Sequence, residues 1–74
     1  MLLRKDRRML LLKILKDARL ERGLRQLDVA LALGRPQSYV AKVESGERKV
    51  DCIDVIDFCN VVSLDPVKLV KRLK

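Results

Sequence analysis

Glycines and prolines divide this 74-residue chain into short segments, and their spacing limits the possible folds more than any other feature. Gly23, Gly34 and Gly46 each follow a run with helical periodicity, at positions where glycine suits the left-handed end of a helix. Pro36 and Pro66 suit the first turn of a helix, because proline has no backbone N–H to donate. The spacing therefore predicts several short helices.

The predicted fold class is all-α, with five helices and no β-rich alternation. Their expected ranges are about Met9 to Arg22, Gln26 to Leu33, Pro36 to about Glu44, Cys52 to about Val62, and a last helix opening at Asp65–Pro66. Asp51 and Asp65 are expected N-caps, since a carboxylate there accepts a bond from a free backbone N–H. Residues 1–8 form a basic N-terminal extension, either a frayed tail or an added turn, and residues 9–74 form one domain.

Apolar residues three and four apart indicate the face that each helix turns inward. The expected inward residues are Leu11, Ile14, Leu15 and Ala18, then Val40 and Val43, then Cys52, Val55, Ile56 and Cys59, and finally Val67, Val70 and Leu73. The second helix carries Leu27, Ala30, Leu31 and Leu33. Tyr39 and Phe58 are the chain's two aromatic residues, so the core has to be mostly aliphatic.

The chain is strongly basic, with 17 Lys and Arg against 10 Asp and Glu and a formal charge of +7. This excess favours a polyanionic partner, either nucleic acid or an anionic membrane surface, although a basic surface also serves solubility alone. The most apolar stretch, Met9 to Leu15, is far shorter than the roughly 20 residues that span a bilayer. With no secretory signal either, the expected location is cytoplasmic.

Cys52 and Cys59 are seven residues apart, which on one helix separates them by about 10.5 Å along the axis. That distance exceeds disulfide reach, and the chain has no histidine and no third cysteine for a zinc site. We therefore expect reduced core thiols, no metal and no cofactor. The lack of histidine and of a base beside any serine also argues against an enzyme.

The segments 26–33 and 36–44 have the lengths and the glycine turn that a helix-turn-helix needs. In that motif the first helix holds the second against the core, and the second projects into a groove about 12 Å wide. Ala30 is small enough to let the two helices approach closely.

A longer pattern runs without a gap from about Leu11 to the C-terminus. Its residues are Arg19, 21–26, Val29–Ala30, Leu33–Gly34, 37–48, Asp51 and 64–66. This order resembles the Cro and phage-repressor type of helix-turn-helix regulators, often called the XRE type. The resemblance implies a five-helix lambda-repressor-like DNA-binding domain, prokaryotic or phage-encoded and nucleoid-associated.

The resemblance also implies roles for individual residues. Those implied to contact base edges are Gln37, Ser38 and Lys42, whose amide, hydroxyl and ammonium groups suit that task. Those implied to contact DNA phosphates are Arg25, Gln26, Arg35, Tyr39, Arg48 and Lys49. The alternative for each cation is a solvated surface charge, and for Tyr39 it is packing against the second helix.

Two further roles implied by the resemblance are internal to the protein. Gln26 is implied to brace Gln37, the first residue of the reading helix. Arg19 and Glu44 are implied to form a partly buried ion pair that ties the first helix to the end of the third.

The sequence departs from the family pattern at two helix starts. Arg25 stands where the family often has a Ser or Thr N-cap, so the second helix start is expected to be looser or shifted. Pro36 replaces a capping hydroxyl, so the register of the reading helix is open to a shift of one residue.

The expected function is a repressor-like regulator that reads the major groove with helix 36–44, as a homodimer on a palindromic site. Its dimer surface is expected on the last helix or on spare apolar residues of the first. One alternative is a protein–protein adaptor or antitoxin that binds a partner through Met9, Leu10, Leu12 and Leu20. Another is an interfacial membrane peptide formed by residues 1–20.

Overall fold

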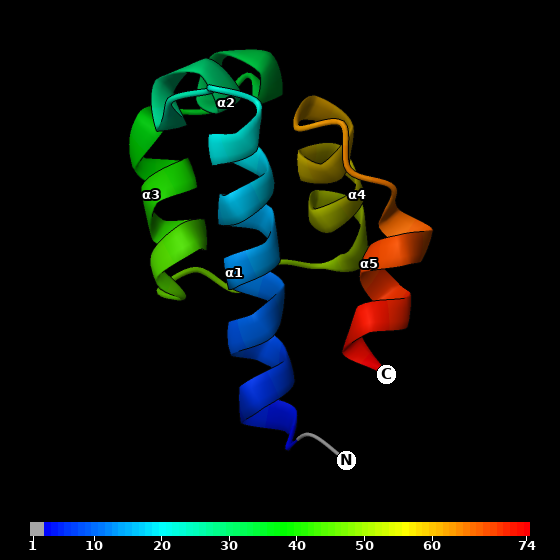
Figure 1. The fold of residues 1–74 in the computed structure, drawn as a ribbon. Helices are drawn as coiled ribbons and strands as arrows, with labels where there is room; N and C mark the ends of the chain where they lie inside the picture. Colours follow the sequence, from blue (N-terminus) through cyan, green and yellow to red (C-terminus); the bar gives the residue numbers. More distant parts are fainter. Residues whose placement is uncertain (1–2) are drawn as a thin grey trace.

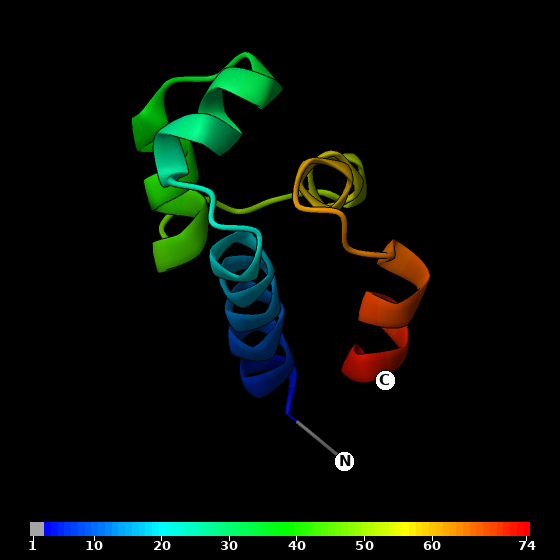
Figure 2. The same cartoon turned by 45° about the horizontal axis from the view of Figure 1, so that its top comes forward.

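A computed structural model describes residues 3–74, which form five α-helices and no strand (Figure 1). They are α1 (Arg4–Glu21), α2 (Gln26–Leu33), α3 (Gln37–Ser45), α4 (Cys52–Val61) and α5 (Pro66–Leu73). α1 runs through the middle of the molecule, with α3 on one side of it and α5 on the other (Figures 1 and 2). The prediction of an all-α, five-helix fold is confirmed, while the division of the chain at residue 9 stays a prediction.

α1 begins at Arg4, well before the predicted start at Met9. The added residues favour a helix, since Arg, Lys and Leu are good helix formers and no Gly or Pro interrupts them. Arg8 Nη2 donates a hydrogen bond of 3.3 Å to the carbonyl of Gly46, which ties this part of α1 to the end of α3. Residues 4–8 are therefore helical and not a frayed tail, while residues 1–2 lie outside the described range.

The ends of α2 and α3 depend on Gly34 and Gly46. Both are C-caps in the left-handed conformation, with φ of 68° and 85°, which costs glycine little because it has no Cβ. α2 has the predicted bounds. α3 begins one residue later than predicted, because Pro36 has an extended backbone and precedes the helix as its N-cap. The register of α3 is therefore counted from Gln37.

The start of each of the last two helices has an aspartate cap. Asp51 accepts a hydrogen bond of 2.8 Å from the backbone N–H of Asp54, and Asp65 accepts one of 2.9 Å from that of Val67. Both predicted N-caps are confirmed.

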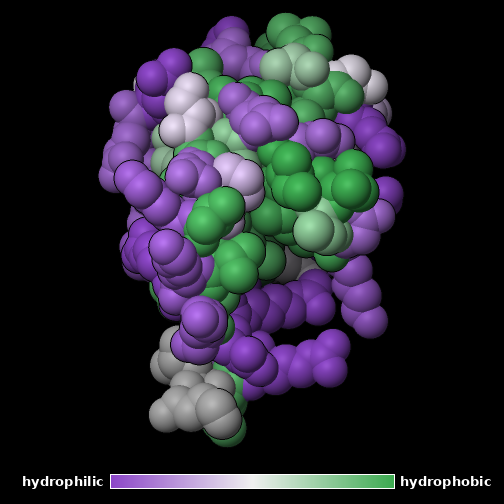
Figure 3. All heavy atoms as spheres, turned by 90° about the vertical axis from the view of Figure 1, so that its right-hand side faces the viewer, coloured by the Kyte–Doolittle hydropathy of each residue, from purple (hydrophilic) through white to green (hydrophobic). Residues whose placement is uncertain are grey.

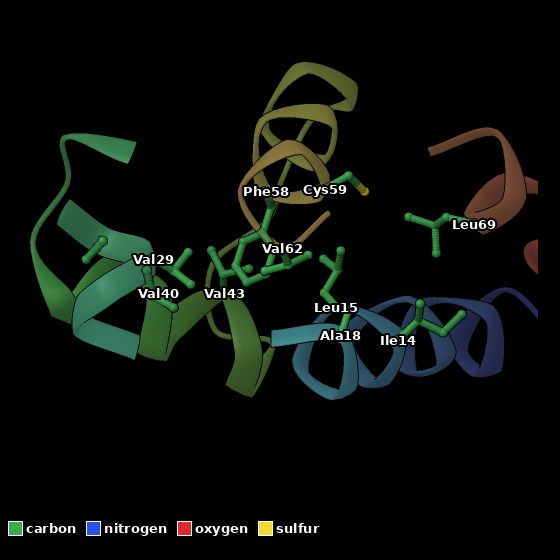
Figure 4. Close-up of a cluster of buried hydrophobic side chains, with 11 residues drawn as sticks. Ile14, Leu15, Ala18, Val29, Val40, Val43, Phe58, Cys59, Val62 and Leu69 are labelled. Carbon is green, nitrogen blue, oxygen red and sulfur yellow. The ribbon is translucent and has the colours of Figure 1, made fainter. Parts of the chain in front are cut away.

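All five helices contribute to one core of aliphatic side chains around a single aromatic ring (Figure 4). Its buried members are Ile14, Leu15, Ala18, Val29, Ala30, Val40, Val43, Phe58, Cys59, Val62 and Leu69. The inward faces predicted for α1 and α3 are confirmed, with Leu11 half-buried at the edge. Ala30 is fully buried, as close packing of α2 on α3 requires.

The predicted inward face of α4 is wrong at its first residue. Cys52 is exposed, so it is not a core thiol, and α4 buries Phe58 and Cys59 near its other end. α4 is apolar on more than one face, and periodicity alone does not show which face meets the rest of the bundle. Cys59 is a buried free thiol as predicted, and burial raises its pKa.

The predicted inward face of α5 is wrong at Val67 and Val70 for the same reason, whereas Leu73 packs against the core as predicted. Val67 and Val70 are 60% and 59% exposed, whereas Leu69 is buried and Leu73 is half-buried. Leu69 and Leu73 are one turn apart, so together they form the face that packs on the core. The outer face of α5 therefore presents valines to solvent.

Candidate nucleic-acid interface

A chain of hydrogen bonds connects the interior of the bundle to the first residue of α3. Arg19 on α1 binds Glu44 on α3 through two bonds, Nε to Oε2 at 2.6 Å and Nη2 to Oε1 at 2.9 Å. Gln26 Nε2, at the start of α2, donates to Glu44 Oε1 at 3.1 Å. Gln37 Nε2 then donates to Gln26 Oε1 at 2.7 Å. Four side chains from three helices therefore fix one another.

The inner half of this chain is shielded from solvent. The side chains of Arg19 and Glu44 are 8% and 4% exposed, and the third donor of the guanidinium, Nη1, binds the carbonyl of Leu24 at 2.8 Å. Within residues 3–74, no buried side-chain nitrogen or oxygen lacks a partner. Such full pairing is needed here, because a buried charge without its partner is strongly destabilising.

The outer face of α3 carries polar side chains opposite its buried valines. Gln37, Ser38 and Lys42 are all exposed, while Val40 and Val43 point into the core. Gln37 and Lys42 lie more than one turn apart, so they reach different points along the helix. The face can therefore offer an amide, a hydroxyl and an ammonium group to one partner.

Tyr39 lies between two arginines from the segments that flank α3. The Cζ atoms of Arg35 and Arg48 are each 4.9 Å from the centroid of its ring, within the range of a cation–π contact. The ring is half-buried and packs against the core at the same time. Tyr39 therefore packs on the core and also makes two cation–π contacts, which the sequence did not indicate.

The start of α2 is capped from inside the helix. Arg25 has no side-chain acceptor, but Asp28 Oδ2 accepts a hydrogen bond of 2.8 Å from the backbone N–H of Arg25. The Arg25 guanidinium also binds Asp28, with Nη2 to Oδ1 at 2.8 Å, and this bond holds the pKa of Asp28 down to about 2. The expected shift of the helix start is absent, since α2 begins at Gln26 as predicted.

Asp28 is a residue whose role the sequence analysis missed. An acidic residue three positions after a helix cap is one half of a capping box, and this spacing was the available signal. The Arg25 guanidinium already donates two hydrogen bonds to Asp28, through Nε and Nη2, so a DNA phosphate would have to bind it beside this carboxylate.

The remaining predicted phosphate contacts are exposed and flank α3. Arg35 precedes the helix, and Arg48 and Lys49 follow it. Over residues 3–74 there is no cluster of three or more metal-binding side chains, and no helix long and apolar enough to cross a membrane.

Comparison with known proteins places this geometry in a family. A family model described as helix-turn-helix matches residues 15–66, from the middle of α1 to the first residue of α5. The chain is also similar to a solved structure of an XRE-family like protein from Pseudomonas syringae pv. tomato str. DC3000. The identity is 42% with a TM-score of 0.89, over 93% of this chain and 84% of the other. The chain belongs to the XRE family of helix-turn-helix proteins.

In this XRE-family protein, α2 and α3 are the two helices of the motif, and DNA binding and transcription regulation are the activities of the family. None of the curated proteins compared with it matches. The segment matched by the family model excludes residues 4–14, so the first half of α1 lies outside it.

Proposed function

We propose that this XRE-family protein is a sequence-specific, repressor-like regulator that binds duplex DNA as a homodimer, with α3 in the major groove. The bond between Gln26 and Gln37 carries this proposal. A side chain held in place before binding loses less conformational entropy when it meets a base. Gln37 is braced in this way, at the end of a network anchored in the core.

The exposed side chains of α3 have the chemistry for reading bases. Gln37 pairs in a bidentate manner with adenine, Lys42 reaches the acceptors of guanine, and Ser38 serves either a base or a phosphate. Gln26 and the flanking arginines then contact the phosphates that border the groove, and the Tyr39 ring holds Arg35 and Arg48 in position for these contacts.

In vitro selection from random duplexes of about 30 base pairs, long enough for two half-sites, tests the proposal. We expect enrichment of a palindrome. The double variant Q37A/K42A should lose preference for the selected duplex over a scrambled one, by about 1–3 kcal/mol for each lost base contact. The matched control N60A/K68A removes an amide and an ammonium from exposed positions on α4 and α5. Failure to enrich any sequence, or equal effects of the two variants, would overturn sequence-specific reading.

Two observations support a homodimer, namely the size of α3 and a groove on the opposite side of α1. The nine residues of α3 are about 13.5 Å long, which covers only about four base pairs. Between α4 and α5 lies an apolar groove of about 400 Å³, lined by Cys52, Val55, Ile56, Pro66, Val67, Val70, Lys71 and Lys74. Figure 3 shows hydrophobic residues gathered on this face. A second copy seated there doubles the DNA contact and leaves both α3 helices free.

The operator of such a dimer contains two inverted half-sites whose centres are about 34 Å apart. The proposed location is the bacterial cytoplasm at the nucleoid. The genes under control follow from where the selected palindrome occurs.

A protein–protein adaptor or antitoxin is the second candidate, and a groove between α1 and α3 favours it. Three of the four spare apolar residues line this groove of about 540 Å³, namely Met9, Leu12 and Leu20. Leu10 is not among them, because it is half-buried against the core. If Q37A/K42A abolishes DNA binding while association with a partner survives, the groove acts independently of DNA.

A further inference from the structure

The first half of α1 and the loop after α3 enclose a basic cleft of about 220 Å³. It is lined by Arg4, Arg8, Leu11, Leu12, Arg48, Lys49 and Val50. Four of these residues are cationic and none is acidic. The leucines and the valine supply apolar walls, which strengthen the attraction between the cations and an anion placed among them.

No cation of the cleft is held in an ion pair within the described residues. The ion pairs within residues 3–74 are Lys13–Asp17, Arg19–Glu44 and Arg25–Asp28, and none includes a residue of the cleft. Arg4 and Arg8 are one turn apart on α1, where like charges repel. A bound anion relieves this repulsion, so the cleft is electrostatically suited to receive one.

Packing holds the cleft in shape. The bond from Arg8 Nη2 to the carbonyl of Gly46 joins its two walls. Leu12 packs on the same residue, since a Cβ built on Gly46 would lie 3.2 Å from Leu12 Cδ1. The cations of α1 are therefore kept beside those of the loop before any ligand arrives.

Arg48 connects the cleft to the face that reads DNA. It lines the cleft and also stacks on Tyr39 of α3. We propose that the cleft binds a backbone phosphate of the same duplex that α3 reads, through Arg4 and Arg8. This inference rests on the proposed function and extends the DNA contact to a part of α1 outside the segment that matches the family model. Arginine suits the task because its planar guanidinium binds phosphate oxygens in a bidentate manner.

The dependence of affinity on salt tests this proposal. The full chain and its variants are titrated with the selected duplex and with a scrambled duplex, by fluorescence anisotropy at several KCl concentrations. Each phosphate contact adds about 0.9 to the slope of log K against log salt. We expect R4Q/R8Q to lower that slope by about 1 to 2 and to weaken binding to both duplexes by the same factor, because phosphates carry no sequence.

Two control variants separate a local contact from net charge. K13Q/K68Q removes two charges from positions outside the cleft, and its slope should stay near that of the wild type. R4K/R8K keeps both charges and should keep most of the slope. Circular dichroism checks that every variant is folded.

Three outcomes would overturn the proposal. In the first, R4Q/R8Q and K13Q/K68Q have equal slopes while the wild type still binds its palindrome, so the proposed function stands without the cleft. In the second, the wild type binds no duplex, and both proposals fail. In the third, R4Q/R8Q loses binding to vesicles of anionic phospholipid but keeps the wild-type slope on DNA, and the cleft then serves a membrane surface.

Discussion

Tyr39 illustrates how one side chain can position two of the residues that we propose as phosphate contacts. Its ring contacts both Arg35 and Arg48, although these residues are 13 positions apart in sequence. An arginine stacked on a ring is restricted before it meets a phosphate, which reduces the entropy lost on binding. The ring is therefore expected to matter more than the hydroxyl.

This expectation is tested by comparing Y39F with Y39L. Phenylalanine keeps both cation–π contacts, so Y39F should bind the selected duplex almost as tightly as the wild type. Leucine removes both contacts, and Y39L should weaken binding by about 1–2 kcal/mol in an anisotropy titration. If Y39F loses as much affinity as Y39L, the hydroxyl binds DNA and the stack contributes little.

Glu44 has a different role, because its carboxylate joins Arg19 to Gln26 inside the protein. E44A leaves a guanidinium in a site with almost no solvent, and we expect the free energy of unfolding to fall by about 3–5 kcal/mol in urea denaturation. Replacing both charges, as in R19M/E44L, should restore much of that loss, since an apolar pair needs no charge partner. A loss below about 1 kcal/mol in E44A would contradict the inference that this pair holds α1 to α3.

The start of α2 depends on the charge of Asp28, which predicts a response to acid. Its pKa is about 2 in the folded protein, below its ordinary value, because the Arg25 guanidinium and backbone stabilise the carboxylate. A depressed folded-state pKa adds stability above the ordinary pKa, and this stability is lost as the pH falls toward 2. In thermal melts followed by circular dichroism, the advantage of the wild type over D28N should therefore shrink from about pH 4 to pH 2.

D57N is the matched control for this experiment, since it makes the same charge change on an exposed face of α4. The trend in D28N counts as evidence for the bond between Arg25 and Asp28 only where it exceeds the trend in D57N. A constant difference between the wild type and D28N across the whole range would show that the carboxylate does not act through its charge.

Helix boundaries were largely predictable from sequence, because local chemistry determines them. Gly34 and Gly46 end α2 and α3, and Asp51 and Asp65 begin the last two helices. The start of α1 was predictable only in part. Residues 4–8 are good helix formers, but the hydrogen bond that ties them to the bundle reaches Gly46, 38 residues away from Arg8, and the local sequence does not indicate it.

The inward faces of α4 and α5 and part of the candidate site depend on packing between distant segments. Val67 and Val70 form as regular an apolar pattern as Leu69 and Leu73, and packing of α5 against α1 and α4 decides which pair is buried. The family resemblance had led us to expect that Gln26 and Gln37 lie close together. The proximity of Arg4 to Arg48 had no such precedent, because it arises where the first half of α1 passes the loop after α3.

At the scale of the whole molecule, the proposed DNA-binding and dimer surfaces lie on opposite sides, so the proposed dimer can be tested without disturbing the fold. α3 and α5 lie on opposite sides of α1, so a substitution on the outer face of α5 leaves the reading face intact (Figure 1). Val67 and Val70 are exposed in the single chain, and charge at these positions should separate the two copies while each keeps its fold.

Analytical ultracentrifugation at concentrations well above the wild-type Kd for dimerisation should show a dimer for the wild type and a monomer for V67E/V70E. The control L20E/L31E places two acidic residues at exposed leucines of α1 and α2, and it should remain dimeric. If the control dissociates and V67E/V70E does not, the dimer forms through the first two helices and leaves the groove between α4 and α5 open.

The same variant predicts a change in DNA recognition. Linking two half-sites through a dimer raises affinity by about 10²–10⁴-fold without any new base contact. V67E/V70E should therefore bind the full palindrome hardly better than a single half-site, while its preference for the half-site over scrambled DNA stays that of the wild type. Such a result would separate the roles of the two surfaces. α3 would then determine which sequence is bound, and dimer formation through α5 would determine how tightly the palindrome is bound.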